Sequence, residues 1–386
     1  MNSEKLTELP IIDCHVHYFG GPEINEIDRH LAWHESCGVS RLNALMLSVR
    51  GVGNTNPDGF YAKARHPGRV WLFAALDYSA IVTGADHRWT LPLPEQIDRF
   101  IAAGCDGLKL LNGKPTERKS MGIALDSPVY EGCFARLEER GFPVLWHVND
   151  PEQNWDSEKV PEDARKHGWY YDSSYPSKEA IYGECERVLE RHPKLKVIFA
   201  HFYFLSADLP RAAALLERYP NVHLDVTPGT EMYINFTRQH EESREFFLRY
   251  QDRILFGTDS GFVKPEAPRP DRYGPTMPVR RFLETGDTYN VSELWLNPAD
   301  RGEVRGLALP TEALRKIYAE NFQRIVSTEP QPLNRQVVMR ELNRQAGLCD
   351  ELGASVNVAR RVACHMAGEP EPEDWRQLLH GGECLA

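Results

Sequence analysis

The chain has 386 residues, which is long enough for one large barrel domain or two domains of ordinary size. Hydrophobic residues make up 41% and charged residues 26%, the proportions of an ordinary globular protein. The formal net charge of −11 argues against nucleic acid and acidic membranes as partners, because both require a basic surface. A small anionic substrate remains compatible with this charge, because a site can be locally positive in a protein of negative net charge.

The sequence favours a cytoplasmic protein that is not inserted in a membrane. The first ten residues are polar and lack the apolar core of a signal peptide. No run approaches the roughly 18 apolar residues of a membrane span. The eight cysteines form no CxxC pair, which indicates reduced thiols.

Eight short apolar runs recur along the chain, each bounded by turn signals. They are residues 11–16, 42–48, 70–76, 107–111, 142–147, 196–201, 222–226 and 253–257. Their first residues lie about 26 to 54 positions apart, and a strand with its crossover helix needs roughly 30. Several runs are continuous rather than alternating, which is typical of parallel strands covered on both faces.

The segments between these runs have helical patterns. Clear cases are residues 128–141, 177–192, 209–219 and 311–325, with Gly141 ending the first helix and Thr311 capping the last. Eight strands alternating with helices predict an α/β fold, a (β/α)8 TIM barrel. A doubly wound open sheet is the alternative, but it would need fewer strands.

The chain divides into a catalytic barrel over residues 1–330 and a C-terminal helical extension over 331–386. Residues 150–175 are polar and aromatic and follow the fifth predicted strand. We expect them to form a long loop on the face where barrel sites lie. The extension could serve a homodimer interface.

The first strand ends in Asp13-Cys14-His15-Val16-His17. Side chains alternate along a strand, so Asp13, His15 and His17 are predicted to share one side. If that side is the barrel interior, both imidazoles converge at the carboxyl-end mouth, where they suit zinc or a similar cation. The alternative is a pair of satisfied core histidines.

Other strands end in residues of the same kind. His147 ends the fifth run, His201 ends the sixth, and Asp259 follows the eighth. In a barrel these strand ends form the catalytic face. Three such residues together with the HxH pair are difficult to assign to packing alone.

This set of motifs resembles the amidohydrolase superfamily, and specifically the amidohydrolase-related branch that includes aminocarboxymuconate-semialdehyde decarboxylase. The resemblance covers about residues 10 to 327. Its motifs are IIDCHVH, LDSPVYEGCFARLEERGFPVLWHVND, HPKLKVIFAHF, ILFGTDSGF and the closing helix LPTEALRKIYAENFQRI around Asn321.

The resemblance implies one divalent metal held by His15, His17, His147 and Asp259, with His201 as a base or substrate-polarising group. The histidine-rich set favours zinc. Such an ion acidifies a bound water, and Asp259 could also take a proton from that water. We therefore expect a hydrolase that cleaves a C–O, C–N or C–C bond beside a carbonyl of a small molecule. Non-oxidative decarboxylation of an aromatic or unsaturated acid is the runner-up, and an inactive scaffold barrel is the third reading.

Lys109 ends the fourth strand. In two-metal members of the superfamily a lysine there becomes a carbamate bridging both ions, so a second metal is an alternative to the single ion that we favour. Lys109 could instead contact an anionic substrate, as could Arg50 after the second strand and Asn149 after the fifth. Asp13 either orients a ligand imidazole or binds backbone, and residues 202–204 predict an aromatic wall.

Overall fold

A computed structural model describes residues 6–20, 24–48, 54–261, 276–290, 302–354 and 357–370. Arg50, one of the expected substrate contacts, lies outside these ranges. So do the last residues of the C-terminal extension, from 371 onwards.

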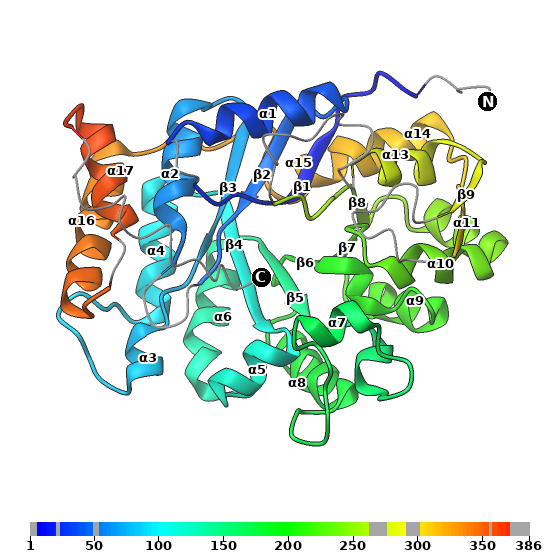
Figure 1. Ribbon diagram of the computed structural model, residues 1–386, viewed down its shortest axis with the longest axis horizontal. Helices are drawn as coiled ribbons and strands as arrows, with labels where there is room; N and C mark the ends of the chain where they lie inside the picture. Colours follow the sequence, from blue (N-terminus) through cyan, green and yellow to red (C-terminus); the bar gives the residue numbers. More distant parts are fainter. Residues whose placement is uncertain are drawn as a thin grey trace.

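Eight parallel strands form one sheet in the order β1 to β8 (Figure 1). They are β1 Ile12–His17, β2 Arg41–Leu45, β3 Val70–Ala75, β4 Gly107–Gly113, β5 Val144–Val148, β6 Val197–Phe199, β7 Val222–Asp225 and β8 Ile254–Leu255. All eight predicted runs are strands, although β6 and β8 are shorter than expected. The first and last strands meet through a parallel bridge between Val16 and Ser260, where His17 N donates to Ser260 O at 2.8 Å. The (β/α)8 barrel is confirmed.

Helices and short turns connect and surround the strands (Figure 1). Within the described residues they are α1 Glu26–Ser36, α2 Asn56–Arg65, α3 Ser79–Thr83, α4 Leu93–Ala103, α5 Pro115–Met121, α6 Pro128–Arg140, η1 Glu152–Trp155, α7 Glu162–Lys166, α8 Lys178–Arg191, η2 Ala200–Phe204, α9 Leu209–Arg218, α10 Thr230–Arg238, α11 His240–Arg249, α13 Thr276–Glu284, α14 Thr311–Arg315, η4 Lys316–Glu320, α15 Asn321–Ile325, α16 Arg335–Glu351 and α17 Val358–Ala367, with a small hairpin of β9 Thr288–Asn290 and β10 Glu303–Arg305. None of these described helices combines the length and the apolar character that crossing a membrane requires.

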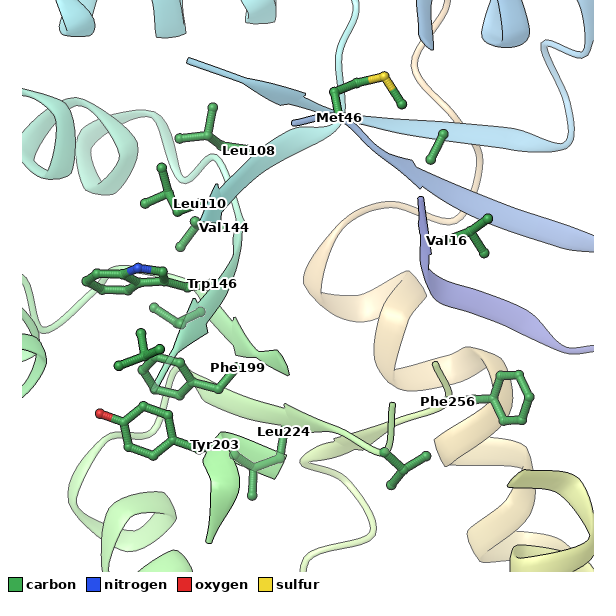
Figure 2. Close-up of a cluster of buried hydrophobic side chains, with 14 of the residues drawn as sticks. Val16, Met46, Leu108, Leu110, Val144, Trp146, Phe199, Tyr203, Leu224 and Phe256 are labelled. Atoms are coloured by element: carbon green, nitrogen blue, oxygen red, sulfur yellow. The ribbon is translucent and has the colours of Figure 1, made fainter. Parts of the chain in front are cut away.

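The strands bury side chains on both faces, which explains their continuous apolar runs. The outward side chains, such as Trp146 and Phe199, pack under the helices (Figure 2). A smaller cluster fills the barrel interior and includes Trp71 and Phe73 of β3. Phe322 of α15 packs edge-on against Trp71, with ring centroids 5.2 Å apart, so the closing helix seals this interior cluster.

The closing helix is continuous from Thr311 to Ile325 but contains one π turn, Lys316–Glu320. Its cap differs from the prediction. Pro310 occupies the N-cap position and Thr311 is already helical, without a side-chain cap bond. Asn321 has the anchoring role, because its amide donates to the carbonyls of Gln251 and Ile254 beside β8.

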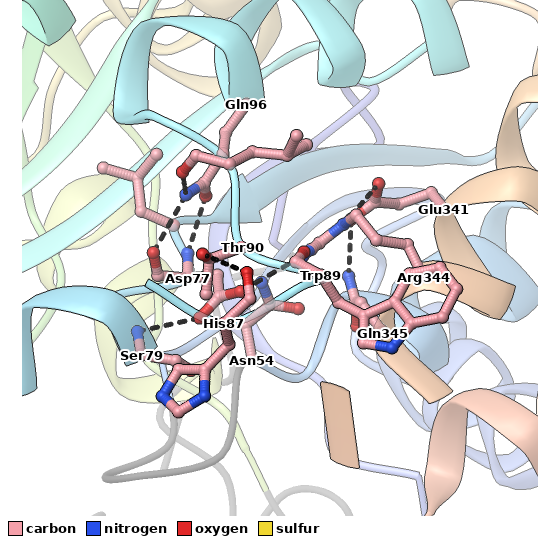
Figure 3. A network of polar contacts seen from close by, with 12 residues as sticks. Asn54, Asp77, Ser79, His87, Trp89, Thr90, Gln96, Glu341, Arg344 and Gln345 are labelled. Atoms are coloured by element: carbon pink, nitrogen blue, oxygen red, sulfur yellow. Dashed lines mark hydrogen bonds and ion pairs between the residues drawn. The ribbon is translucent and has the colours of Figure 1, made fainter. Parts of the chain in front are cut away.

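The C-terminal helix α16 is tied to the barrel by a buried polar network (Figure 3). Arg344 lies 2.7 Å from Glu341 of the same helix and 3.3 Å from Asp77, which follows β3. Arg344 also donates to the carbonyl of Trp89 at 2.5 Å, and Gln96 of α4 binds the backbone of Asp77 from the other side. The described part of the extension is therefore helical and packs on the β3 side of the barrel.

Candidate metal centre

Strand β1 places both of its histidines in the mouth through an irregularity in its pairing with β2, between Asp13 and Val16. Asp13 points out of the barrel, where its carboxylate lies 3.6 Å from His34 Nε2 of helix α1. Beyond the irregularity His15 turns inward. The prediction that Asp13 shares a side with His15 and His17 is wrong, because irregular pairing interrupts the strict alternation of a strand.

The Asp13 carboxylate binds backbone rather than a ligand imidazole. It accepts from the backbone N–H of His15 at 3.1 Å and from that of Thr258 at 3.2 Å. The Thr258 hydroxyl donates to its second oxygen at 2.5 Å. Asp13 thereby joins β1 to the segment that follows β8, which supports the backbone-binding alternative.

Three of the four predicted ligands lie together. His15 Nε2 is 3.3 Å from His17 Nε2 and 3.4 Å from Asp259 Oδ1, and His17 Nε2 is 3.2 Å from the same oxygen. These residues form a group capable of holding a metal ion. Donors about 2.1 Å from a tetrahedral ion lie about 3.4 Å from one another, so the spacing fits a divalent metal. The Asp259 side chain is 38% exposed, which opens the group to solvent and substrate.

Asp225, at the end of β7, determines which ring nitrogen of His15 carries the proton. Its Oδ2 lies 2.8 Å from His15 Nδ1, and both side chains are fully buried. A carboxylate accepts, so Nδ1 carries the proton and Nε2 presents its lone pair to His17 and Asp259. Burial, and then the charge of Lys109, hold the pKa of His15 well below its usual range. His15 is therefore neutral, as a metal ligand must be.

His147 lies on the opposite side of the mouth, outside the three-residue group. Its ring centroid is 4.9 Å from that of His201, and its Nε2 is 3.1 Å from Asp150 Oδ1. Asp150 is in turn held by the Tyr171 hydroxyl, from the long loop, and by Lys114 at 3.4 Å. Because the carboxylate accepts from Nε2, the lone pair of His147 is on Nδ1. Burial lowers the pKa of His147 to about 4, against the hydrogen bond with Asp150.

His201 begins a left-handed turn at the end of β6. Residues 201 to 204 all have φ between 52° and 55°. For residues with a Cβ atom this conformation costs roughly 1–2 kcal/mol each, and such strain is concentrated at functional sites. Asp225 Oδ1 accepts the backbone N–H of His201 at 2.8 Å, and Tyr182 donates to the Tyr203 carbonyl at 2.7 Å. Burial lowers the pKa of His201 to about 4, so its imidazole is neutral.

The prediction that residues 202–204 form an aromatic wall holds for only one of the three side chains, because the left-handed turn buries the other two. Phe202 and Tyr203 are buried in the core, 0% and 2% exposed, so they cannot face a substrate. Only Phe204 lies in the mouth, where its ring is nearly parallel to that of His201 at 5.2 Å and lies 5.4 Å from that of His147.

Lys109 lies in the site, with Nζ 3.3 Å from His15 Nε2 and 3% of the residue exposed. Burial lowers the pKa of Lys109 to about 8, against the charges of Asp259 and Asp225. Its amine therefore competes with a cation for the lone pair of His15 unless it moves, loses its proton or is modified.

Asn149 directly follows β5, and its residue is fully buried with a φ of 70°. Its amide nitrogen donates to the Lys178 carbonyl at 3.1 Å. Its Oδ1 is buried and has no partner among the residues that the structure describes. Lys109 lies beside His15, Asn149 is buried next to β5, and Arg50 lies outside the described residues, so their contacts with a substrate stay predictions.

The sequence assigned no role to Asp225, and it indicated Asp150 only as a possible substrate contact, not as the partner of His147. Asp225 is the last residue of β7, and His147, His201 and Asp259 were singled out because they lie at or just beyond the carboxyl ends of other strands. The same positional signal could have identified Asp225. The pairing of each carboxylate with a particular histidine depends on distances across the barrel, which no local pattern shows.

The fold and the site together define a (β/α)8-barrel protein with a candidate metal centre at the carboxyl ends of its strands. The chain belongs to the amidohydrolase family, whose model, described as Amidohydrolase, matches residues 12–326. A search of curated proteins found no match.

Solved structures share the fold at low identity. An uncharacterized TIM-barrel protein from Bordetella bronchiseptica is 16% identical, with 82% of this chain and 98% of that chain covered and a TM-score of 0.51. IDCase from Metarhizium anisopliae, in its apo form, is 13% identical, with 82% and 96% covered and a TM-score of 0.50. A 2,6-dihydroxybenzoate decarboxylase from Rhizobium is 17% identical, with 82% and 98% covered and a TM-score of 0.47. The first two likenesses show the barrel fold.

Proposed function

We propose that this protein is a metal-dependent hydrolase that cleaves a C–O, C–N or C–C bond beside a carbonyl of a small organic substrate. The observation that carries the proposal is the convergence of His15 Nε2, His17 Nε2 and Asp259 Oδ1 within 3.4 Å of one another. We further propose zinc, because the donors are two imidazoles and a carboxylate. His147, the fourth ligand that the sequence predicts, would have to move towards this group to bind the same ion.

A bound divalent ion would supply a positive charge that polarises a carbonyl and acidifies water. The protein's own residues would supply the proton transfers. Asp259 is the partly exposed member of the group, so its second carboxylate oxygen can reach a water or a substrate. It would receive a proton from the attacking water and pass it to the leaving group.

His201 would orient the substrate carbonyl. It is neutral, and its Nδ1 has no hydrogen-bond partner among the described residues. A neutral imidazole can donate one hydrogen bond to a developing oxyanion. The left-handed turn and the Asp225 contact fix the backbone of His201, so this donor would be in place before the reaction begins.

The substrate would be small and could carry a negative charge. Lys109 is cationic below its pKa of about 8, and the amide oxygen of Asn149 has no partner among the described residues. Both would contact the substrate, and Lys109 would do so more strongly when the substrate is an anion.

Decarboxylation of an aromatic or unsaturated acid is the second candidate. Two flat surfaces favour it: Phe204 is nearly parallel to His201 at 5.2 Å, and Phe19 is nearly parallel to His17 at 6.2 Å. Stacking on such rings suits a planar substrate. Hydrolysis needs no planar substrate and is favoured by the ionisable, partly exposed Asp259.

One screen separates the two reactions. Small esters, lactones and amides, beside hydroxybenzoate-like acids, are offered to the zinc-loaded protein in oxygen-18 water. Hydrolysis places the label in the product and is lost when Asp259 is replaced by Asn. Release of carbon dioxide, with solvent deuterium on the ring or alkene carbon, would contradict hydrolysis and support the second candidate.

A further inference from the structure

We propose that His34, on the outer helix α1, is a positioning residue for Asp259, and that it acts through Ser260 and Thr258. The inference rests on the proposed metal site and adds a residue that contacts no metal ligand. The side chains involved are those of His34, Ser260, Thr258 and Asp13, which lie where β1 meets the segment after β8.

The hydrogen bonds of His34 define its tautomer, in which Nδ1 donates and Nε2 accepts. Its ring is buried, and Nδ1 lies 2.8 Å from the carbonyl of His30 one turn earlier in α1. A carbonyl only accepts, so Nδ1 carries the proton. Nε2 is then an acceptor, and the Ser260 hydroxyl at 2.9 Å donates to it.

The chain of hydrogen bonds continues to the other side of Asp259. The backbone N–H of Ser260 donates to the Thr258 hydroxyl oxygen at 3.3 Å. That hydroxyl donates to Asp13 Oδ2 at 2.5 Å, and Thr258 N donates to Asp13 Oδ1 at 3.2 Å. The residues immediately before and after Asp259 are therefore both fixed by buried side chains of other elements.

Asp259 needs this support because its own backbone is strained. Its φ is 58°, in the left-handed region that residues with a Cβ atom avoid. Return to an ordinary φ would swing the carboxylate away from His15 and His17, which lie 3.4 Å and 3.2 Å from its oxygen. Such a relaxation requires Thr258 or Ser260 to move, and the contacts with Asp13 and His34 oppose that movement.

His30 is a matched control on the same helix. It is also a buried histidine, 4% exposed, and its ring packs edge-on against Tyr18 at 5.4 Å. Within the described residues its side chain stacks on the ring of His34, with centroids 6.5 Å apart, but contacts none of residues 258 to 260. The carbonyl that accepts from His34 belongs to the backbone of His30 and is kept in an alanine variant. Replacing His30 by Ala should therefore disturb packing to a similar extent and leave the support of Asp259 intact.

The test is zinc affinity of metal-stripped full-length protein, measured by competition with a chromophoric chelator. We expect His34→Ala to weaken zinc binding by about 10- to 100-fold, the usual effect of losing a residue that orients a metal ligand. His30→Ala should stay within about twofold of the wild type. His34→Gln, whose amide oxygen can accept from Ser260, should recover most of the affinity.

Thermal unfolding of the metal-free variants separates positioning from stability. If His34→Ala and His30→Ala lower the unfolding midpoint equally and bind zinc equally well, His34 has only a packing role and the inference is overturned. If His34→Ala does not fold, Ser260→Ala removes only the hydroxyl, and unchanged zinc affinity there overturns it. No zinc binding by the wild type would instead refute the proposed function, and the inference with it.

Discussion

The imidazole of His15 donates its Nδ1 proton to the carboxylate of Asp225 across 2.8 Å, inside the barrel and out of contact with solvent. The same carboxylate accepts the backbone N–H of His201 through its other oxygen. One side chain at the end of β7 thus orients a metal-ligand candidate from β1 and holds the turn that presents the catalytic candidate from β6.

Asp225→Asn should weaken zinc binding by about 10- to 100-fold, because the asparagine amide can donate to Nδ1 and so leave the proton on Nε2, facing the metal. Chelator competition on metal-stripped protein measures the effect. His223→Gln is the control, since His223 is also buried and lies two residues earlier in the same strand. Equal affinities for Asp225→Asn and wild type would show that the contact does not set the tautomer.

His201→Asn should leave zinc content near that of wild type and lower turnover by roughly 100-fold or more, the scale of a lost acid–base or polarising group. Asparagine tolerates positive φ better than most residues, so the turn should persist at φ 54°. Elemental analysis and steady-state kinetics are measured on the same preparation. Metal loss as great as that of His17→Ala would show that His201 is a ligand.

Glu231, in helix α10, should make stability fall with rising pH. Burial raises its pKa from 4.5 to about 7, so the folded protein retains a proton that the unfolded chain has released between these values. The contribution of Glu231 to the free energy of unfolding is fully present below about pH 4.5 and is lost as the pH rises through about 7. The loss is at most about 3 kcal/mol.

Urea unfolding at several pH values between 5 and 8 tests this dependence. Glu231→Gln should reduce the fall in unfolding free energy over that interval, because glutamine does not titrate. An identical slope in the variant and the wild type would assign the pH dependence to other groups.

Arg344→Ala should destabilise the protein by about 3–5 kcal/mol, because it leaves the buried Asp77 carboxylate without its cation and Glu341 with only Arg99, at 3.8 Å. Denaturant unfolding is the measurement. Arg340→Ala, on an exposed position of the same helix, is the control and should change the free energy of unfolding by less than about 0.5 kcal/mol. A small effect of Arg344→Ala would mean that α16 is held by apolar packing.

The fold could be predicted from the sequence because parallel strands covered on both faces read as continuous apolar runs. Runs such as 70–76 and 142–147 matched strands β3 and β5 closely. The runs at 196–201 and 253–257 were longer than their strands, since the chain leaves the sheet into the left-handed conformations of His201 and Asp259. The hydrophobic pattern of a sequence does not show at which residue the backbone takes a positive φ and the strand ends.

The site could be predicted only as far as position along the strands determines it. Strand ends identified His15, His17, His201 and Asp259 because barrel geometry brings these ends together. The outward turn of Asp13 could not be predicted, because it follows from irregular pairing between β1 and β2. The hydrogen bonds of Asp225 and Asp150 with histidines depend on contacts between distant segments, which have no local signature.

The most direct test of the account is the metal content of protein purified without chelator. Elemental analysis should find about one divalent ion per chain, with zinc dominant, and His15→Ala, His17→Ala and Asp259→Ala should each lose it. Two ions per chain, with the mass of one carbon dioxide added on Lys109, would contradict the single-metal centre. No bound metal, even after supplementation with zinc, would contradict the metal-dependent enzyme and favour an inactive barrel.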